Sequence, residues 1–268
     1  MHVHFLDSYR PRASLIHRID PRIKLVLTVA FILTSTLLPG GAWPIYFLFF
    51  ALLLSVEIIS ELGVTFVLKR SSLALPFVLT ALPLILTIPG KTLFNLSVGP
   101  WIIHASVPGL IRFVSIAIKS WLSVQAAIVL AASTSFPDLL LAIRALHVPQ
   151  LLVSIFGLMW RYLFVLVDEA ARLMRARASR SGLSDLPGAR PGGSIPWRAR
   201  VTGGMAGSLF LRAFERSDRI YMAMVSRGYD GEVRTLPLPA VQPTQWVVLI
   251  ASLSLLGTFL GIAYLMWG

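Results

Sequence analysis

The chain has 268 residues, of which 56% are hydrophobic and only 13% are charged, and its mean hydropathy is +0.77. This composition excludes an ordinary soluble domain, and several apolar runs approach the roughly 20 residues that a helix needs to cross a bilayer. The lack of cysteine excludes disulfides, thiolate metal sites and a catalytic cysteine. The net charge of +12 is typical of arginine-rich cytoplasmic segments that face anionic lipid, so nucleic-acid binding is not expected.

Apolar segments are predicted to cross the membrane as helices, because a backbone in hydrocarbon must satisfy its own hydrogen bonds. In chain order these predicted spans are 23–38, 43–59, 73–88, 110–132 and 246–267. Lys69 and Arg70 are expected in a short basic loop before the third span. Residues 91–108, before the fourth span, are expected to be irregular or hairpin-like.

A sixth apolar stretch, Leu151 to Val167, decides the predicted topology. If it crossed the membrane, residues 168–243 would lie outside, together with half of the 24 basic residues. If it does not cross, every basic cluster lies inside, as the positive-inside rule requires. Arg161 also interrupts the stretch, at a cost of about 2–3 kcal/mol or more within a span. We therefore predict five spans, with the N-terminus in the cytoplasm.

The predicted organisation is an all-α integral membrane protein with a coupling domain inserted before its last span. Residues 1–132 hold the N-terminal tail and the first four spans, residues 133–243 form the cytoplasmic domain, and residues 244–268 form the last span. The insertion is expected to contain long amphipathic helices, because its apolar residues recur at helical spacing. A Gly/Pro-rich segment, 182–196, separates two of them.

Each of these two helices ends in a tripeptide with a central arginine. The first is Ser179-Arg180-Ser181 and the second is Ser226-Arg227-Gly228, with the arginines 47 positions apart. Glycine after the second arginine suits a helix C-terminal cap.

These tripeptides resemble the paired Ala/Ser-Arg-Gly signature of the transmembrane (T) subunits of energy-coupling-factor (ECF) transporters, the EcfT/CbiQ family. The flanking residues are similar to the CbiQ branch, which is associated with cobalt transport: Ile19-Asp20-Pro21-Arg22-Ile23-Lys24, Arg161-Tyr162-Leu163-Phe164-Val165-Leu166 and Trp197-Arg198-Ala199-Arg200. The resemblance implies a non-catalytic scaffold that joins two ATP-binding-cassette ATPases to a separate membrane subunit that binds cobalt. It also implies that Arg180 and Arg227 contact acidic groove residues of the ATPases, which bind the ATP, so no cofactor or metal is expected in this chain.

Two details of the resemblance leave alternatives open. Ser181 stands where the family often has glycine, and Gly182 follows one place later, so Arg177 is a rival to Arg180 for the docking role. Gly203 and Gly207 have the spacing of a small-xxx-small contact, which we interpret as close packing of the two coupling helices rather than a flexible helix start.

The expected function is therefore ATP-driven cobalt uptake across a bacterial or archaeal cytoplasmic membrane. Related scaffolds serve nickel or vitamins, so these substrates are alternatives. A permease with its own pathway is a second alternative, for which Lys119 in the fourth span would be a candidate residue. An enzyme acting on a lipid intermediate is the third, although the sequence lacks the intramembrane carboxylate or histidine cluster that it would need. The chain also lacks a GxxxxGK[ST] phosphate-binding loop.

Overall fold

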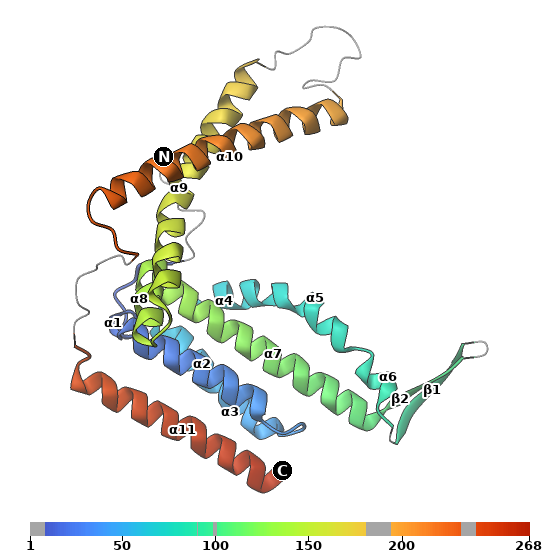
Figure 1. The fold of residues 1–268 in the computed structure, drawn as a ribbon. Helices are drawn as coiled ribbons and strands as arrows, with labels where there is room; N and C mark the ends of the chain where they lie inside the picture. The colour runs from blue at the N-terminus through green and yellow to red at the C-terminus, as the bar shows by residue number, and fades with distance from the viewer. Residues whose placement is uncertain (1–8, 90, 99–100, 181–193, 232–239) are drawn as a thin grey trace. The chain divides into compact units, whose positions relative to one another are not determined.

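The computed structural model describes residues 9–89, 91–98, 101–180, 194–231 and 240–268, and the chain divides into two compact units (Figure 1). One unit comprises residues 4–145 together with 238–268 and is called the membrane unit below. The other comprises the described residues between 146 and 237 and is called the hairpin unit.

The membrane unit is built from helices and one β-hairpin. Its elements are α1 (Leu15–Arg18), α2 (Pro21–Leu37), α3 (Trp43–Ile59), α4 (Val64–Ser71), α5 (Leu75–Val78), α6 (Leu84–Thr87), β1 (Thr92–Val98), β2 (Trp101–Ser106), α7 (Val107–Ser133), α8 (Phe136–Ala145) and α11 (Pro243–Trp267). Short 3₁₀ turns, Ser72–Ala74 and Leu79–Ala81, flank α5. The strands pair antiparallel, with Val98 opposite Trp101, which confirms the predicted hairpin-like segment.

Local sequence explains where the main helices begin. Asp20 caps α2, its carboxylate accepting a hydrogen bond from the backbone N–H of Arg22 at 2.9 Å, and proline occupies the first helical position. Ser106 caps α7 in the same way by accepting from the N–H of Gly109 at 3.1 Å. Both starts follow the cap-then-proline pattern that marks helix N-termini in sequences.

Four helical segments among the described residues are long and apolar enough to cross a membrane: Val64–Ala81, Val107–Ser133, Gln150–Arg180 and Pro243–Trp267. Trp43–Ile59 is a shorter apolar helix, and α2 coincides with the first predicted span at 17 residues. The protein is thus a multi-pass, predominantly α-helical membrane protein, as predicted.

The third predicted span is wrong in its bounds. The helical segment begins at Val64, directly after Gly63, and ends at Ala81, so Lys69 and Arg70 lie in the last turn of α4 and not in a loop. Two prolines account for the 3₁₀ turns around α5, because a proline has no N–H to bond the carbonyl four residues earlier: Pro76 leaves that of Ser72 without its α-helical partner, and Pro83 leaves that of Leu79. Apolar content located the apolar part of this helical segment but not its first residues, because the polar residues of α4 reduce the average hydropathy there.

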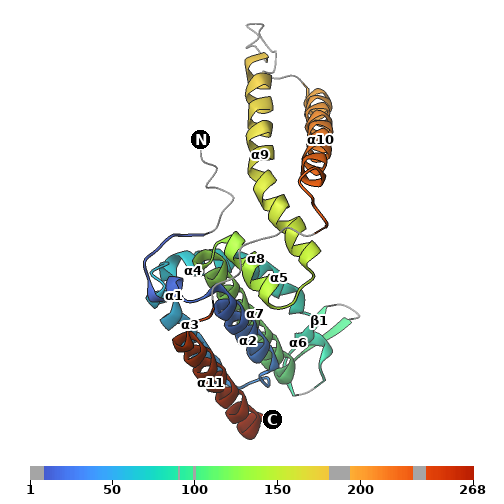
Figure 2. The ribbon, with the colours of Figure 1, turned by 60° about the vertical axis from the view of Figure 1, so that its left-hand side comes forward.

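The core of the membrane unit lies between α2, α3, α7 and α11. Phe49 is fully buried there, with its ring centroid 5.2 Å from that of Phe31 and 6.0 Å from that of Phe259. Leu122 on α7 and Leu256 on α11 complete the cluster. Helices α2, α7 and α11 consequently lie side by side in both ribbon views (Figures 1 and 2).

Lys119 closes the turn between α2 and α3. Its ammonium donates to the carbonyl oxygens of Leu38 and, at 3.3 Å, Thr36, which are among the carbonyls left free at the end of α2. Tyr46 holds the same turn by donating from its hydroxyl to the carbonyl of Pro39 at 2.6 Å. A cation at a helix C-terminus is favourable in the helix dipole, so these contacts support a structural role for Lys119 over a transport pathway.

The hairpin unit consists of two 31-residue helices, α9 (Gln150–Arg180) and α10 (Ile195–Val225). At about 1.5 Å per residue each is about 46 Å long, and the two helices contact one another. By length and composition alone α9 could also cross a membrane.

Candidate functional site

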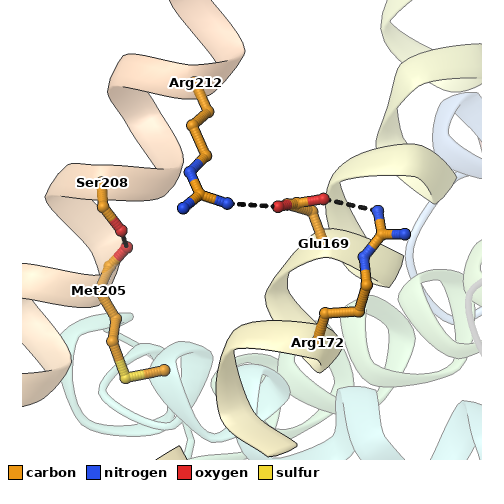
Figure 3. Close-up of polar contacts among 5 residues, drawn as sticks. All are labelled: Glu169, Arg172, Met205, Ser208 and Arg212. Atoms are coloured by element: carbon orange, nitrogen blue, oxygen red, sulfur yellow. Dashed lines mark hydrogen bonds and ion pairs between the residues drawn. The ribbon is translucent and has the colours of Figure 1, made fainter. Parts of the chain in front are cut away.

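An ion-pair cluster joins α9 to α10 in the hairpin unit (Figure 3). One carboxylate oxygen of Glu169 accepts from Arg172 on the same helix at 2.5 Å, and the other accepts from Arg212 on α10 at 2.8 Å. Hydrogen bonds from these two guanidinium groups lower the pKa of Glu169. The sequence did not reveal this cluster, because Arg212 lies 43 residues away along the chain.

A second contact between the helices involves Arg177. Its guanidinium donates to the hydroxyl oxygen of Thr202 on α10 at 3.0 Å, and its side chain is half-buried. Arg177 therefore faces the neighbouring helix, whereas Arg180, three residues later, is exposed.

The serines that precede the two arginines make the same hydrogen bond. Ser179 donates from its hydroxyl to the carbonyl of Ala176 at 3.0 Å, and Ser226 donates to the carbonyl of Ala223, also at 3.0 Å. The residues that follow, Arg180 and Arg227, are exposed. Within the described ranges neither arginine forms an ion pair, so both guanidinium groups can donate to carboxylates of a partner.

Arg227 sits in a Schellman turn, the common glycine-ended helix cap. The N–H of Gly228 donates to the carbonyl of Val225 at 2.9 Å, and the N–H of Tyr229 donates to that of Met224 at 3.1 Å. Gly228 has φ +82, a left-handed conformation that favours glycine. The predicted C-terminal cap is confirmed. Ser181, which was predicted to follow the first arginine in the docking motif, lies outside the described residues.

Gly203 and Gly207 do not have the predicted helix-packing contact in this structure. Both are exposed, and a Cβ atom added at either would meet nothing within 4 Å. The half-buried side chains in this part of α10 include Met205 and Leu209 instead. The small-xxx-small packing of the two helices therefore stays a prediction, and the contacts that the structure shows between them are side-chain contacts such as the ion pair of Arg212 with Glu169.

Metal-binding side chains do not gather in the described structure. No group of three or more His, Asp or Glu side chains in the described ranges could hold a metal ion, and His2 and His4 lie outside those ranges.

The sequence matches the profile of the CbiQ family, described as cobalt transport protein, over residues 12–237. The chain belongs to the CbiQ family.

Two of three curated relatives of this CbiQ family member carry transporter names. The energy-coupling factor transporter transmembrane protein EcfT of Thermosediminibacter oceani is 27% identical over 86% of this chain and 86% of its own length. The cobalt transport protein CbiQ of Salmonella typhimurium is 27% identical over 84% of this chain and 96% of its own. An uncharacterized protein of Methanocaldococcus jannaschii is 28% identical over 86% of this chain and 76% of its own. The CbiQ family member is therefore a transmembrane component of an ECF-type transporter.

Proposed function

We propose that this protein is the non-catalytic scaffold that couples two ATP-binding-cassette ATPases to a separate substrate-binding membrane subunit. The observation that carries the proposal is the pair of matched helix ends, each presenting an exposed arginine one residue after an internally bonded serine. Residues Ser179, Arg180, Ser226, Arg227 and Gly228 form the described part of this docking surface.

Arginine at a helix end is suited to this role. The helix dipole favours a cation at the C-terminus, and a guanidinium group can bind a carboxylate through two parallel hydrogen bonds. The adjacent serine and glycine add little bulk, so the helix end can enter a narrow acidic groove. A desolvated charged contact of this kind is worth about 2–4 kcal/mol.

The contacts of α9 favour Arg180 over Arg177 as the first docking residue. Arg177 already donates to Thr202 and is half-buried against α10, so its use by a partner would require that contact to break. Arg180 is exposed one turn nearer the end of the helix.

The hairpin unit is proposed to lie in the cytoplasm, although α9 has the length of a span. Arg161 interrupts its apolar half, and a charge there would be costly in hydrocarbon. The contact of Glu169 with Arg172 and Arg212 also requires a setting where charged and exposed side chains are solvated. Placing the unit inside keeps the arginine-rich residues on the cytoplasmic side, as the positive-inside rule requires.

Cobalt is the proposed substrate, delivered by the separate membrane subunit. The support is the family description and the name of the Salmonella relative. Nickel or a vitamin is the alternative, because other relatives are named only as energy-coupling factor components.

Co-purification with the ATPase subunits tests the docking surface. The double variant Arg180→Glu with Arg227→Glu is expected to lose the ATPases, because both contacts become repulsive. A matched control, Arg175→Glu with Arg219→Glu, makes the same charge change at exposed positions of the same helices and is expected to retain them. Retention of the ATPases by the first variant would refute the docking assignment.

Binding of Co²⁺ to the purified chain separates the scaffold from a permease with its own pathway. Isothermal titration is expected to show no saturable site in this chain alone and a site in the complex with the substrate-binding subunit. A stoichiometric Co²⁺ site in the isolated chain would favour the permease.

A further inference from the structure

The membrane unit contains an apolar cavity of about 230 Å³ between α2, α3, α7 and α11. Its walls are almost wholly hydrocarbon, with side chains that include Leu27, Phe31, Leu53, Val129, Val248 and Leu256. An apolar cavity of this kind between membrane helices suits a hydrocarbon chain and no polar ligand.

A polar hollow of about 360 Å³ adjoins the apolar cavity. It is bounded by the loop before α2, the segment after α7 and the start of α11, and its charged side chains are Arg18, Lys24, Asp20 and Asp138. Ile19, Lys24 and Ser133 line both spaces, so the two meet at these residues. Together they reach the size of a small-molecule site, roughly 300–1,000 Å³.

Lys24 lies at the boundary between the two spaces. It is only 8% exposed, and its ammonium donates to the carbonyls of Ser133 at 3.1 Å and His17 at 3.4 Å. Because a lysine ammonium has three N–H groups, one remains for another acceptor. In the described ranges no carboxylate forms an ion pair with it.

Thr134 supplies a second, independent indication of a ligand. Its side chain lines the polar hollow and is 3% exposed, yet its hydroxyl oxygen has no hydrogen-bond partner in the described structure. Buried hydroxyl groups in proteins are normally hydrogen-bonded. A polar group in the hollow would satisfy it.

The charges of the hollow determine the kind of head group that fits. Two cations, Arg18 and Lys24, face two carboxylates, Asp20 and Asp138, in one space. A purely anionic head group would meet both carboxylates, whereas a head group carrying a phosphate and an amine can complement both signs.

We infer that the membrane unit binds one phospholipid whose head group is zwitterionic, with a phosphate and an ammonium group. One acyl chain occupies the apolar cavity, the phosphate accepts from Lys24 and lies near Arg18, and the ammonium lies near Asp20 and Asp138. Thr134 hydrogen-bonds the head group. Such a lipid fills the cavity lined by α2, α3, α7 and α11. Two hydrogen bonds also hold α11: Gln245 donates to the carbonyl of Arg18, the last residue of α1, at 3.5 Å, and Tyr264 donates to that of Leu37, the last residue of α2, at 3.1 Å.

Lipid retention by the full chain tests this inference. The protein, purified in mild detergent, is equilibrated with equal amounts of phosphatidylethanolamine and phosphatidylglycerol and repurified, and the bound lipid is quantified by mass spectrometry. We expect near-stoichiometric phosphatidylethanolamine and several-fold less phosphatidylglycerol. Leu27→Trp fills the cavity and is expected to reduce bound lipid several-fold, while Leu33→Trp, at a 57% exposed position of the same helix, leaves it unchanged.

Charge variants test the head group. Lys24→Gln is expected to lower retention of both lipids, because both carry the phosphate. Asp138→Asn removes one negative charge from the hollow and is expected to shift the bound fraction toward phosphatidylglycerol. Should Leu27→Trp fail to fold by its thermal unfolding profile, Ser252→Leu narrows the cavity from α11 and serves as the second variant.

Three outcomes overturn the inference. Unchanged retention by folded cavity-filling variants means that the lipid is only peripheral. Equal retention of the two phospholipids removes the zwitterionic assignment. Complete loss of bound lipid when the substrate-binding subunit is added, with cross-links from that subunit to α2 and α11, means that a helix of the partner occupies the cavity.

Discussion

Replacing Gly228 by alanine tests whether the shape of the second helix end matters apart from its charge. Gly228 has φ +82, and a Cβ atom added there would meet nothing within 4 Å, so the substitution adds no steric clash. Its cost is conformational, about 1–2 kcal/mol for an L-residue in the left-handed region. That cost destabilises the turn around Arg227, which is closed by two backbone hydrogen bonds.

If the ATPase groove binds only this turn conformation, the conformational cost of Gly228→Ala weakens the affinity of the scaffold for the ATPase. A loss of about 1–2 kcal/mol corresponds to a roughly five- to thirty-fold higher Kd. Biolayer interferometry with the ATPase immobilised and the scaffold in nanodiscs measures this change. Gly228→Asn is expected to recover most of the affinity, because asparagine tolerates the left-handed region better than alanine.

The matched control is Gly231→Ala. Gly231 has φ +98 and equally open surroundings, but it lies beyond the turn. The same strain is therefore introduced without disturbing Arg227. Wild-type affinity for Gly228→Ala, or an equal loss in both alanine variants, would refute the reasoning.

Three further predictions concern named contacts. The pKa of Glu169 is lowered, so its contribution to holding α9 against α10 is present above its unfolded pKa of about 4.3 and is lost as pH falls through the folded value. The protection of α10 amides, which is their exchange rate relative to the intrinsic rate at the same pH, is expected to fall at acid pH in the wild type and to lose this dependence in Glu169→Gln. Arg177→Met removes the contact with Thr202 and is expected to speed hydrogen exchange around that residue. It is also expected to weaken ATPase binding less than Arg180→Met does. If Arg177→Met weakened ATPase binding more, Arg177 would be the docking residue. Lys119→Met is expected to lower the free energy of unfolding by about 1.5–3 kcal/mol, which is the range for hydrogen bonds from charged groups, and Lys119→Arg is expected to lower it less. Thermal unfolding measures the loss. A change in substrate selectivity with unchanged stability would contradict the structural role of Lys119.

Apolar runs predicted the long helices well where polar residues border them. The fourth and fifth predicted spans, 110–132 and 246–267, fall within α7 and α11, each of which begins three residues earlier at a capped or proline-containing turn. The bounds of the third span were misplaced because α4 is polar enough to be taken for a loop, although the helical segment continues from it into the apolar part through the two 3₁₀ turns.

Side-chain partners across the chain were beyond the reach of sequence patterns. The pairing of Glu169 with Arg212 depends on how two helices meet, which local spacing does not encode. The same holds for Lys24 and Thr134, whose significance comes from the spaces that they line. The Gly203 and Gly207 spacing was visible, but the same spacing occurs on exposed helix faces. The helix-end arginines could be singled out in the sequence because their signature is short and contiguous, and their docking role stays a prediction.

The serines beside the docking arginines have a consequence for the genetics of the transporter. Ser179 and Ser226 each donate to a carbonyl of their own helix, so up to the arginine the two ends present the same exposed chemistry to a partner. If the proposed docking holds, an acidic groove that accepts one end can accept the other. A single ATPase gene, translated into two identical copies, would then suffice, even though the scaffold is one asymmetric chain.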